Sequence, residues 1–135
     1  MKTIKKAIPF IIIFTFIFSL GSFSFEQEIP RDISIAFKVG NAEELANYFN
    51  NTIELVILDQ EDVYSKVQAQ QILDNFFTEH FPKSFEIIHQ GGKEESKFAI
   101  GKLVTFSGTF RVYFLLKLKN DTPFIHQLRI EAENE

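Results

Sequence analysis

The last third of the chain alternates apolar runs with turn residues, a pattern that predicts an antiparallel meander of four strands. Each run is long enough for a strand and rich in the β-branched and aromatic residues that strands favour. The intervening glycine, serine, asparagine and aspartate residues suit tight turns. The predicted strands are 85–90, 98–106, 110–118 and 124–131, and the predicted turns are 91–93, 107–108 and 120–121. Such a sheet needs upstream elements to cover one face.

Two short helices are predicted at the start of this upstream region. Pro30 and Gly40 suit the first and last positions of a helix over 30–39. Asn41 and Glu44 have the spacing of a capping box for a second helix that runs through Phe49. A turn at 50–51, a strand over 52–58 and a solvated acidic loop over 59–62 complete this part of the prediction.

The main helix is predicted between Ser65 and Pro82. Ser65 and Gln68 form a capping box at its start. Pro82 ends it, because the residue before a proline is pushed out of helical geometry. Apolar side chains recur at helical spacing, so this helix is expected to lie across the meander; they are Val67, Ala69, Ile72, Leu73, Phe76 and Phe77.

The strand registers predict two unequal faces of the meander. A two-residue turn at 107–108 places Phe106 opposite Thr109 and Gly101 opposite Phe114. The face of Phe114 packs under the helices. A three- or four-residue loop around 120–121 brings His126 to that same face and turns Ile125 outward. The other face is too apolar for a purely solvated surface.

Residues 1–24 have the pattern of a secretory signal peptide. A basic start with three lysines precedes an uncharged apolar stretch over 7–21, and small residues follow at 22–24. The alternative is an uncleaved anchor, since the apolar run is only slightly shorter than the roughly 20 residues that span a bilayer. Cleavage leaves 25–135 as one exported domain, in the periplasm or secreted.

Composition narrows the classes of partner. The chain has no cysteine, which excludes disulfides, thiolate metal sites and a lipid-modified cysteine. Without the three lysines of the leader, the chain has 11 of its 14 basic residues and all 18 acidic residues, a net charge of −7. This acidic balance argues against nucleic acid, which is bound by clustered Lys and Arg. His80, His89 and His126 are scattered and predict no metal site.

The order of elements resembles the α+β nuclear transport factor 2-like, or cystatin-like, superfamily, in which helices pack on a curved antiparallel sheet to form a cone. Stretches at 36–42, 63–69 and 108–113 are also similar to a family of small exported bacterial proteins, domain of unknown function 4783. That resemblance implies the same fold and no assigned activity. It adds no cofactor.

Members of this superfamily use the interior of the cone as a pocket, which indicates one set of candidate ligand-binding residues. The resemblance implies a ligand site formed by His126, Phe114, Gly101, Tyr64 and Tyr48. Histidine carries protons near neutral pH, and tyrosine can orient an oxyanion. An isomerase or dehydratase that uses His126 is therefore the alternative function. No catalytic residue is assigned, because no inward carboxylate accompanies His126.

The outer face carries the preferred function, a non-enzymatic exported binding or interaction domain. Superfamily members commonly dimerise there, and an apolar patch rimmed by Lys and Arg suits an interface. The predicted interface is Phe98, Ile100, Arg111, Tyr113, Leu115 and Arg129. The expected partner is a second copy, with a small ligand or an envelope protein as further possibilities. A monomer whose own terminal segment covers this face is the alternative.

Overall fold

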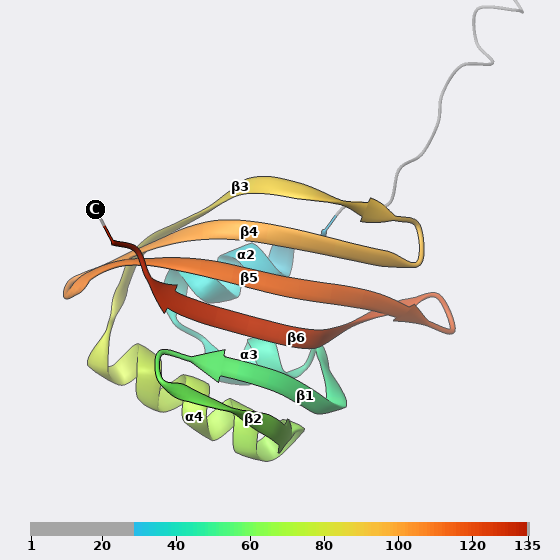
Figure 1. Cartoon of the computed structure of the whole chain (residues 1–135), viewed down its shortest axis with the longest axis horizontal. Helices are drawn as coiled ribbons and strands as arrows, with labels where there is room; N and C mark the ends of the chain where they lie inside the picture. Colours follow the sequence, from blue (N-terminus) through green and yellow to red (C-terminus); the bar gives the residue numbers. More distant parts are fainter. Residues whose placement is uncertain (1–28, 135) are drawn as a thin grey trace, which may run out of the picture.

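Three helices pack on one face of a six-stranded sheet in the computed structural model, which describes residues 29–134 (Figure 1). The predicted signal peptide lies outside these residues. The helices are α2 (Arg31–Val39), α3 (Ala42–Ala46) and α4 (Lys66–Glu79). The strands are β1 (Phe49–Ile57), β2 (Gln60–Ser65), β3 (Pro82–Lys93), β4 (Ser96–Thr105), β5 (Gly108–Lys119) and β6 (Thr122–Ala132). The predicted α+β class and the C-terminal meander are confirmed.

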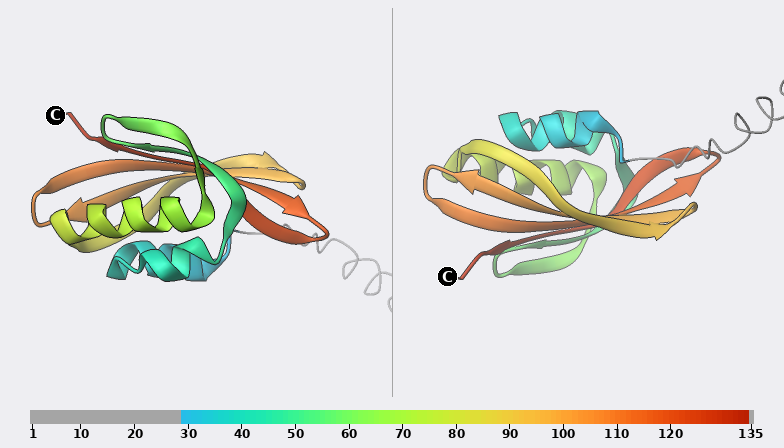
Figure 2. Two further views of the ribbon diagram at one scale, coloured as in Figure 1. Left: turned by 90° about the horizontal axis from the view of Figure 1, so that it is seen from below. Right: turned by 90° about the horizontal axis from the view of Figure 1, so that it is seen from above.

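The sheet has the order β2-β1-β6-β5-β4-β3. The sheet was predicted to be antiparallel, but β1 runs parallel to β6, so this part of the prediction is wrong. Figure 2 shows the helices on one side of the sheet, and the β1–β2 hairpin turned toward the other side. We call the side without helices the outer face. No helix within residues 29–134 is long and apolar enough to span a membrane.

The two short helices form where the capping signals place them, but the second is shorter than predicted. Gly40 ends α2 with a left-handed φ of 70°, which glycine adopts without strain. The Asn41 side chain accepts a hydrogen bond from the Glu44 backbone N–H at 3.0 Å. The α3 helix then ends at Ala46, because Phe49 is drawn into β1, where it is buried and pairs with Ile125.

Two segments predicted as loops belong to strands. Residues 50–51 lie inside β1 although asparagine favours turns; they fall in an irregular stretch between the pairs that Phe49 and Glu54 make with β6. The acidic segment is mostly β2, which pairs antiparallel with β1; Leu55 lies opposite Asp62 and Val56 opposite Glu61. The chain reverses at Leu58, whose φ is 55°. The acidic residues therefore form an edge strand, where charge protects the unpaired backbone.

The α4 helix begins with the predicted capping box. Ser65 Oγ accepts from the Gln68 N–H at 3.2 Å, and Gln68 Oε1 accepts from the Ser65 N–H at 3.1 Å. Its apolar stripe is buried at Ala69, Leu73, Phe76 and Phe77. Two residues of the predicted stripe are exceptions: Val67 is 74% exposed, and Ile72 is only partly buried.

The meander has the predicted strands but different turns. Residues 91–93 continue β3, and the chain turns at 94–95. The β4–β5 turn is 106–107, so Thr105 pairs with Gly108 and Gly101 lies opposite Val112 rather than Phe114. The predicted register is wrong by two residues. Because side chains alternate with a period of two, each side chain keeps its predicted face.

The β5–β6 connection is a two-residue turn, contrary to the expected longer loop. Asn120 and Asp121 have φ of 53° and 63°, the positive values that such hairpin turns require. A bulge further along β6 instead changes which of its side chains face the helices. Leu115 pairs with Gln127 and Leu116 pairs with Ile125, so one extra residue of β6 lies between these pairs. Ile125 is consequently fully buried, which corrects its predicted outward position.

Candidate functional site

The interior of the cone is packed with aromatic rings. Phe37 from α2 stacks on Phe85 at a centroid separation of 4.7 Å and on Phe114 at 5.9 Å. It also meets the edge of Phe77 at 6.3 Å. Phe37 and Phe114 have no exposed surface. The predicted pocket residue Phe114 is therefore part of a filled core.

Gly101 does not leave space for a ligand on this inner side. A Cβ atom placed there would lie 2.3 Å from Cζ of Phe85, because the Phe85 ring covers the glycine backbone. The predicted opening beside Phe114 is thus absent, both because the register places Val112 opposite Gly101 and because Phe85 fills the gap.

The other three pocket candidates lie at the margins of the core. Tyr64, in β2, pairs with Ile53 and is half-buried. Tyr48 precedes β1 and is also half-buried; burial raises its pKa, and the negative charges of Asp32 and Glu44 raise it further. His126 is half-buried at the bulge in β6. The structure does not gather these side chains around one cavity with Phe114 and Gly101.

His126 is expected to make stability depend on pH. Burial lowers its pKa below the ordinary 6.5, and the charges of Lys117 and Lys119 lower it further. The unfolded chain then binds a proton more readily, so the stabilisation is complete above pH 6.5 and is lost as pH falls through the folded pKa. His126→Gln should reduce this loss in urea titrations between about pH 7.5 and 5.

Lys117→Gln provides the control for that measurement. Removal of this charge should move the pKa of His126, followed by NMR, back toward 6.5 without abolishing the titration. An unchanged pH dependence of the free energy of unfolding in His126→Gln would contradict the assignment.

The predicted interface residues do share one surface, the outer face of the sheet. Phe98 pairs with Leu115, Ile100 with Tyr113, and Tyr113 with Arg129 across adjacent strands. The rings of Phe98 and Tyr113 stack at 6.2 Å. The four apolar and aromatic side chains are half-buried, while Arg111 and Arg129 are exposed. An apolar centre with a basic margin therefore exists as the sequence suggested.

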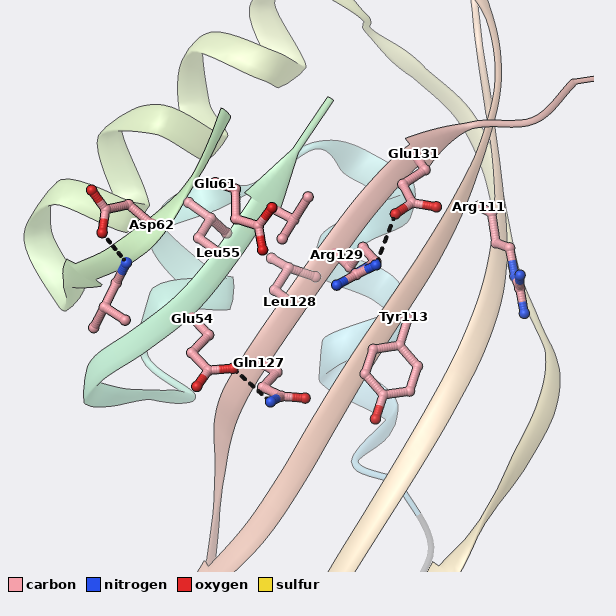
Figure 3. Close-up of a pocket in the computed structure, with 12 residues that line it drawn as sticks. Glu54, Leu55, Glu61, Asp62, Arg111, Tyr113, Gln127, Leu128, Arg129 and Glu131 are labelled. Carbon is pink, nitrogen blue, oxygen red and sulfur yellow. Dashed lines mark hydrogen bonds and ion pairs between the residues drawn. The ribbon is translucent and has the colours of Figure 1, made fainter. Parts of the chain in front are cut away.

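A hollow of about 610 Å³ lies on this face between the β1–β2 hairpin and strands β5 and β6 (Figure 3). Its outer-face side chains combine acidic, basic and apolar groups: Glu54, Val56, Glu61, Val63, Arg111, Tyr113, Gln127, Arg129 and Glu131. A second hollow, of about 560 Å³, lies on the other side of Arg111 and includes His89 and Lys102.

Charge is divided unevenly across the first hollow. The Glu54 carboxylate accepts a hydrogen bond from the Gln127 amide at 2.6 Å, and Arg129 forms an ion pair with Glu131 at 3.2 Å (Figure 3). Arg111 forms no ion pair within residues 29–134. The acidic side chains of the β1–β2 hairpin thus lie across the hollow from Arg111 and Arg129. Of these two guanidinium groups, that of Arg111 could bind a further carboxylate.

The β1–β2 wall of this hollow was not predicted from the sequence. Glu61 was expected in a solvated loop, and Glu54 only on the polar side of an isolated strand. The β-branched and aromatic pair Val63 and Tyr64 is the strand signal that could have identified β2. Within residues 29–134, no group of three His, Asp or Glu side chains is placed to hold a metal ion.

The comparisons with known proteins give the family. The sequence profile of the family described as Domain of unknown function (DUF4783) matches residues 30–131. The chain belongs to this family. A crystal structure of a DUF4783 family protein from Bacteroides ovatus ATCC 8483 is 38% identical, with a TM-score of 0.76; the match covers 81% of this chain and 99% of that one.

Further structures support the fold assignment. A DUF4783 family protein from Bacteroides uniformis ATCC 8492 is 35% identical over 80% of this chain and 100% of its own, with a TM-score of 0.76. A domain with a cystatin-like fold from Nostoc punctiforme PCC 73102 shares 11% identity and a TM-score of 0.63, over 78% of this chain and 73% of that one. No curated protein matches the chain. This DUF4783 domain therefore has the predicted cystatin-like fold and no function assigned by similarity.

Proposed function

We propose that this DUF4783 protein is an exported, non-enzymatic interaction domain that forms a homodimer through its outer sheet face. The observation that carries the proposal is the half-buried cluster of Phe98, Ile100, Tyr113 and Leu115 on a face that no helix of residues 29–134 covers (Figure 2). Soluble monomers rarely leave such a patch open, whereas interfaces combine an apolar centre with a charged rim.

The filled core supports binding at the outer face rather than inside the cone. Phe37, Phe85 and Phe114 occupy the space that an inner ligand would need. The outer hollow instead offers polar groups of both signs around Tyr113. Export is supported by the leader pattern at 1–24, and fractionation of the host cell should place the protein outside the cytoplasm.

Leu115→Glu is expected to convert the dimer to a monomer. The substitution places a carboxylate in the centre of the apolar patch, where a second copy would have to desolvate it. Light scattering should show the loss of dimer mass at concentrations at which the wild type is dimeric. Truncation of a buried interface anchor commonly costs 2 kcal/mol or more, about thirtyfold in Kd.

Ile35→Glu is the matched control. Ile35 is 48% exposed on α2, which covers the other side of the sheet, so the same type of substitution should leave the dimer intact. Circular dichroism should show that both variants are folded. If the wild type remains monomeric at high concentration, or if Leu115→Glu dimerises as tightly as the wild type, the proposal is wrong.

A further inference from the structure

We propose that Arg111 pairs with Glu131 of a second copy, in a dimer whose two-fold axis lies between β5 and β6 and runs parallel to them. This inference rests on the proposed function and deepens it, since it fixes how the two outer faces meet. It uses the register of the sheet, which places the outer side chains in rows across the strands.

Two rows define the surface near this axis. One row contains Lys102, Arg111 and Glu131, which are successive partners on β4, β5 and β6. The next contains Ile100, Tyr113, Arg129 and Val56 on β4, β5, β6 and β1. Near the centre of the face, Arg111 and Tyr113 on β5 therefore lie beside Glu131 and Arg129 on β6.

A two-fold axis along the strands exchanges β5 with β6 and keeps each row level with itself. Arg111 then faces Glu131 of the second copy, and Tyr113 faces Arg129, a favourable cation–π pair. Further from the axis, Ile100 lies over Val56 of the second copy, beside the larger hollow. Each contact occurs twice. The least favourable pairs are Phe98 over Glu54 and Leu115 over Gln127. The Glu54 carboxylate already accepts a hydrogen bond from Gln127 within its own chain.

The single chain leaves Arg111 electrostatically unsatisfied. It lies directly opposite Lys102 on the neighbouring strand, and like charges in such positions destabilise a sheet. Its opposite neighbour on β6, Glu131, is already ion-paired with Arg129. A second copy adds another Glu131 carboxylate beside Arg111, which offsets the repulsion between Arg111 and Lys102.

The competing arrangements leave Arg111 without an acidic partner. A two-fold axis that crosses the strands through the second row places Arg129 on Arg129 of the second copy. It also places Arg111 over Leu115, which cannot accept a hydrogen bond. If that axis lies between the two rows, Glu131 meets Arg129 of the second copy, but Arg111 faces Tyr113 and Ile100 faces Lys102. Of these arrangements, only the axis along the strands gives Arg111 an acidic partner.

Reciprocal charge reversal tests the pairing. Arg111→Glu and Glu131→Arg, each alone, should raise the dimer Kd at least about tenfold, because two attractive pairs become repulsive. A 1:1 mixture of the two variants should form a heterodimer close to wild-type affinity, since each reversed residue then meets its opposite. Native mass spectrometry distinguishes the heterodimer from both homodimers by mass.

Lys38→Glu, a charge reversal on α2, is the control and should dimerise like the wild type. If a reversed chain fails to fold, Arg111→Gln and Glu131→Gln replace the pair. Each should then raise Kd about threefold, and the double variant should raise it no further, because the two substitutions remove the same interaction. A monomeric wild type would refute the proposed function itself. A wild-type dimer with no restoration in the mixture, or no coupling between the neutral variants, would refute only this pairing.

Discussion

Phe37→Ala is expected to lower the free energy of unfolding by about 3–5 kcal/mol, the usual cost of removing a buried phenylalanine. Phe37 is fully buried and its ring contacts those of Phe77, Phe85 and Phe114. Neighbouring rings cannot collapse fully into the vacated space, so a cavity adds to the lost burial. A small domain has only about 5–15 kcal/mol in total.

Urea titration of the wild type and the variant measures this effect, with Phe106→Ala as the matched control. Phe106 is 71% exposed at the β4–β5 turn, where its ring lies beside Phe81 and Lys83. Its loss should change the free energy of unfolding by less than about 1 kcal/mol. Equal losses in the two variants would contradict the description of the cone as filled core.

Gly101→Val is expected to destabilise the protein by about 1–3 kcal/mol, although valine is normally preferred in strands. The added Cβ would approach Cζ of Phe85 to 2.3 Å. The ring cannot move aside freely, because it stacks on Phe37 at 4.7 Å. Thermal or urea unfolding gives the difference from the wild type.

Phe85→Ala provides the second arm of a double-mutant cycle for this contact. If overpacking against Phe85 is the cause, Gly101→Val should cost at least about 1 kcal/mol less in the Phe85→Ala background than in the wild type. Equal costs in both backgrounds would place the strain elsewhere, and would leave the closeness of Gly101 and Phe85 without energetic consequence.

Together these experiments separate the two faces of the sheet. The inner-face variants should reduce stability, whereas Leu115→Glu and the reversals at Arg111 and Glu131 should mainly reduce association. The distinction follows from burial: Phe114 is fully buried under the helices, but Leu115, its neighbour in β5, points to the other face.

Local signals in the sequence determined most of the elements of this protein. The capping box of Ser65 and Gln68, the glycine after Val39 and the alternation in the last three strands act over a few residues. They depend on hydrogen bonds and backbone geometry within the segment itself, so no distant contact is needed to interpret them. The shared outer face of Phe98, Tyr113 and Leu115 followed from strand period alone.

The tertiary structure decided what these signals leave open. A two-residue shift in the β4–β5 register preserves every face, so the hydrophobic pattern cannot distinguish Val112 from Phe114 as the partner of Gly101. The parallel pairing of β1 with β6 joins segments far apart in the chain and brings Glu54 and Glu61 to the outer hollow. The alternation in β4 and β5 indicated which of their side chains lie on each face, but the bulge in β6 and long-range packing determined that Ile125 is buried, that the inner face is filled and that the outer face carries the candidate site.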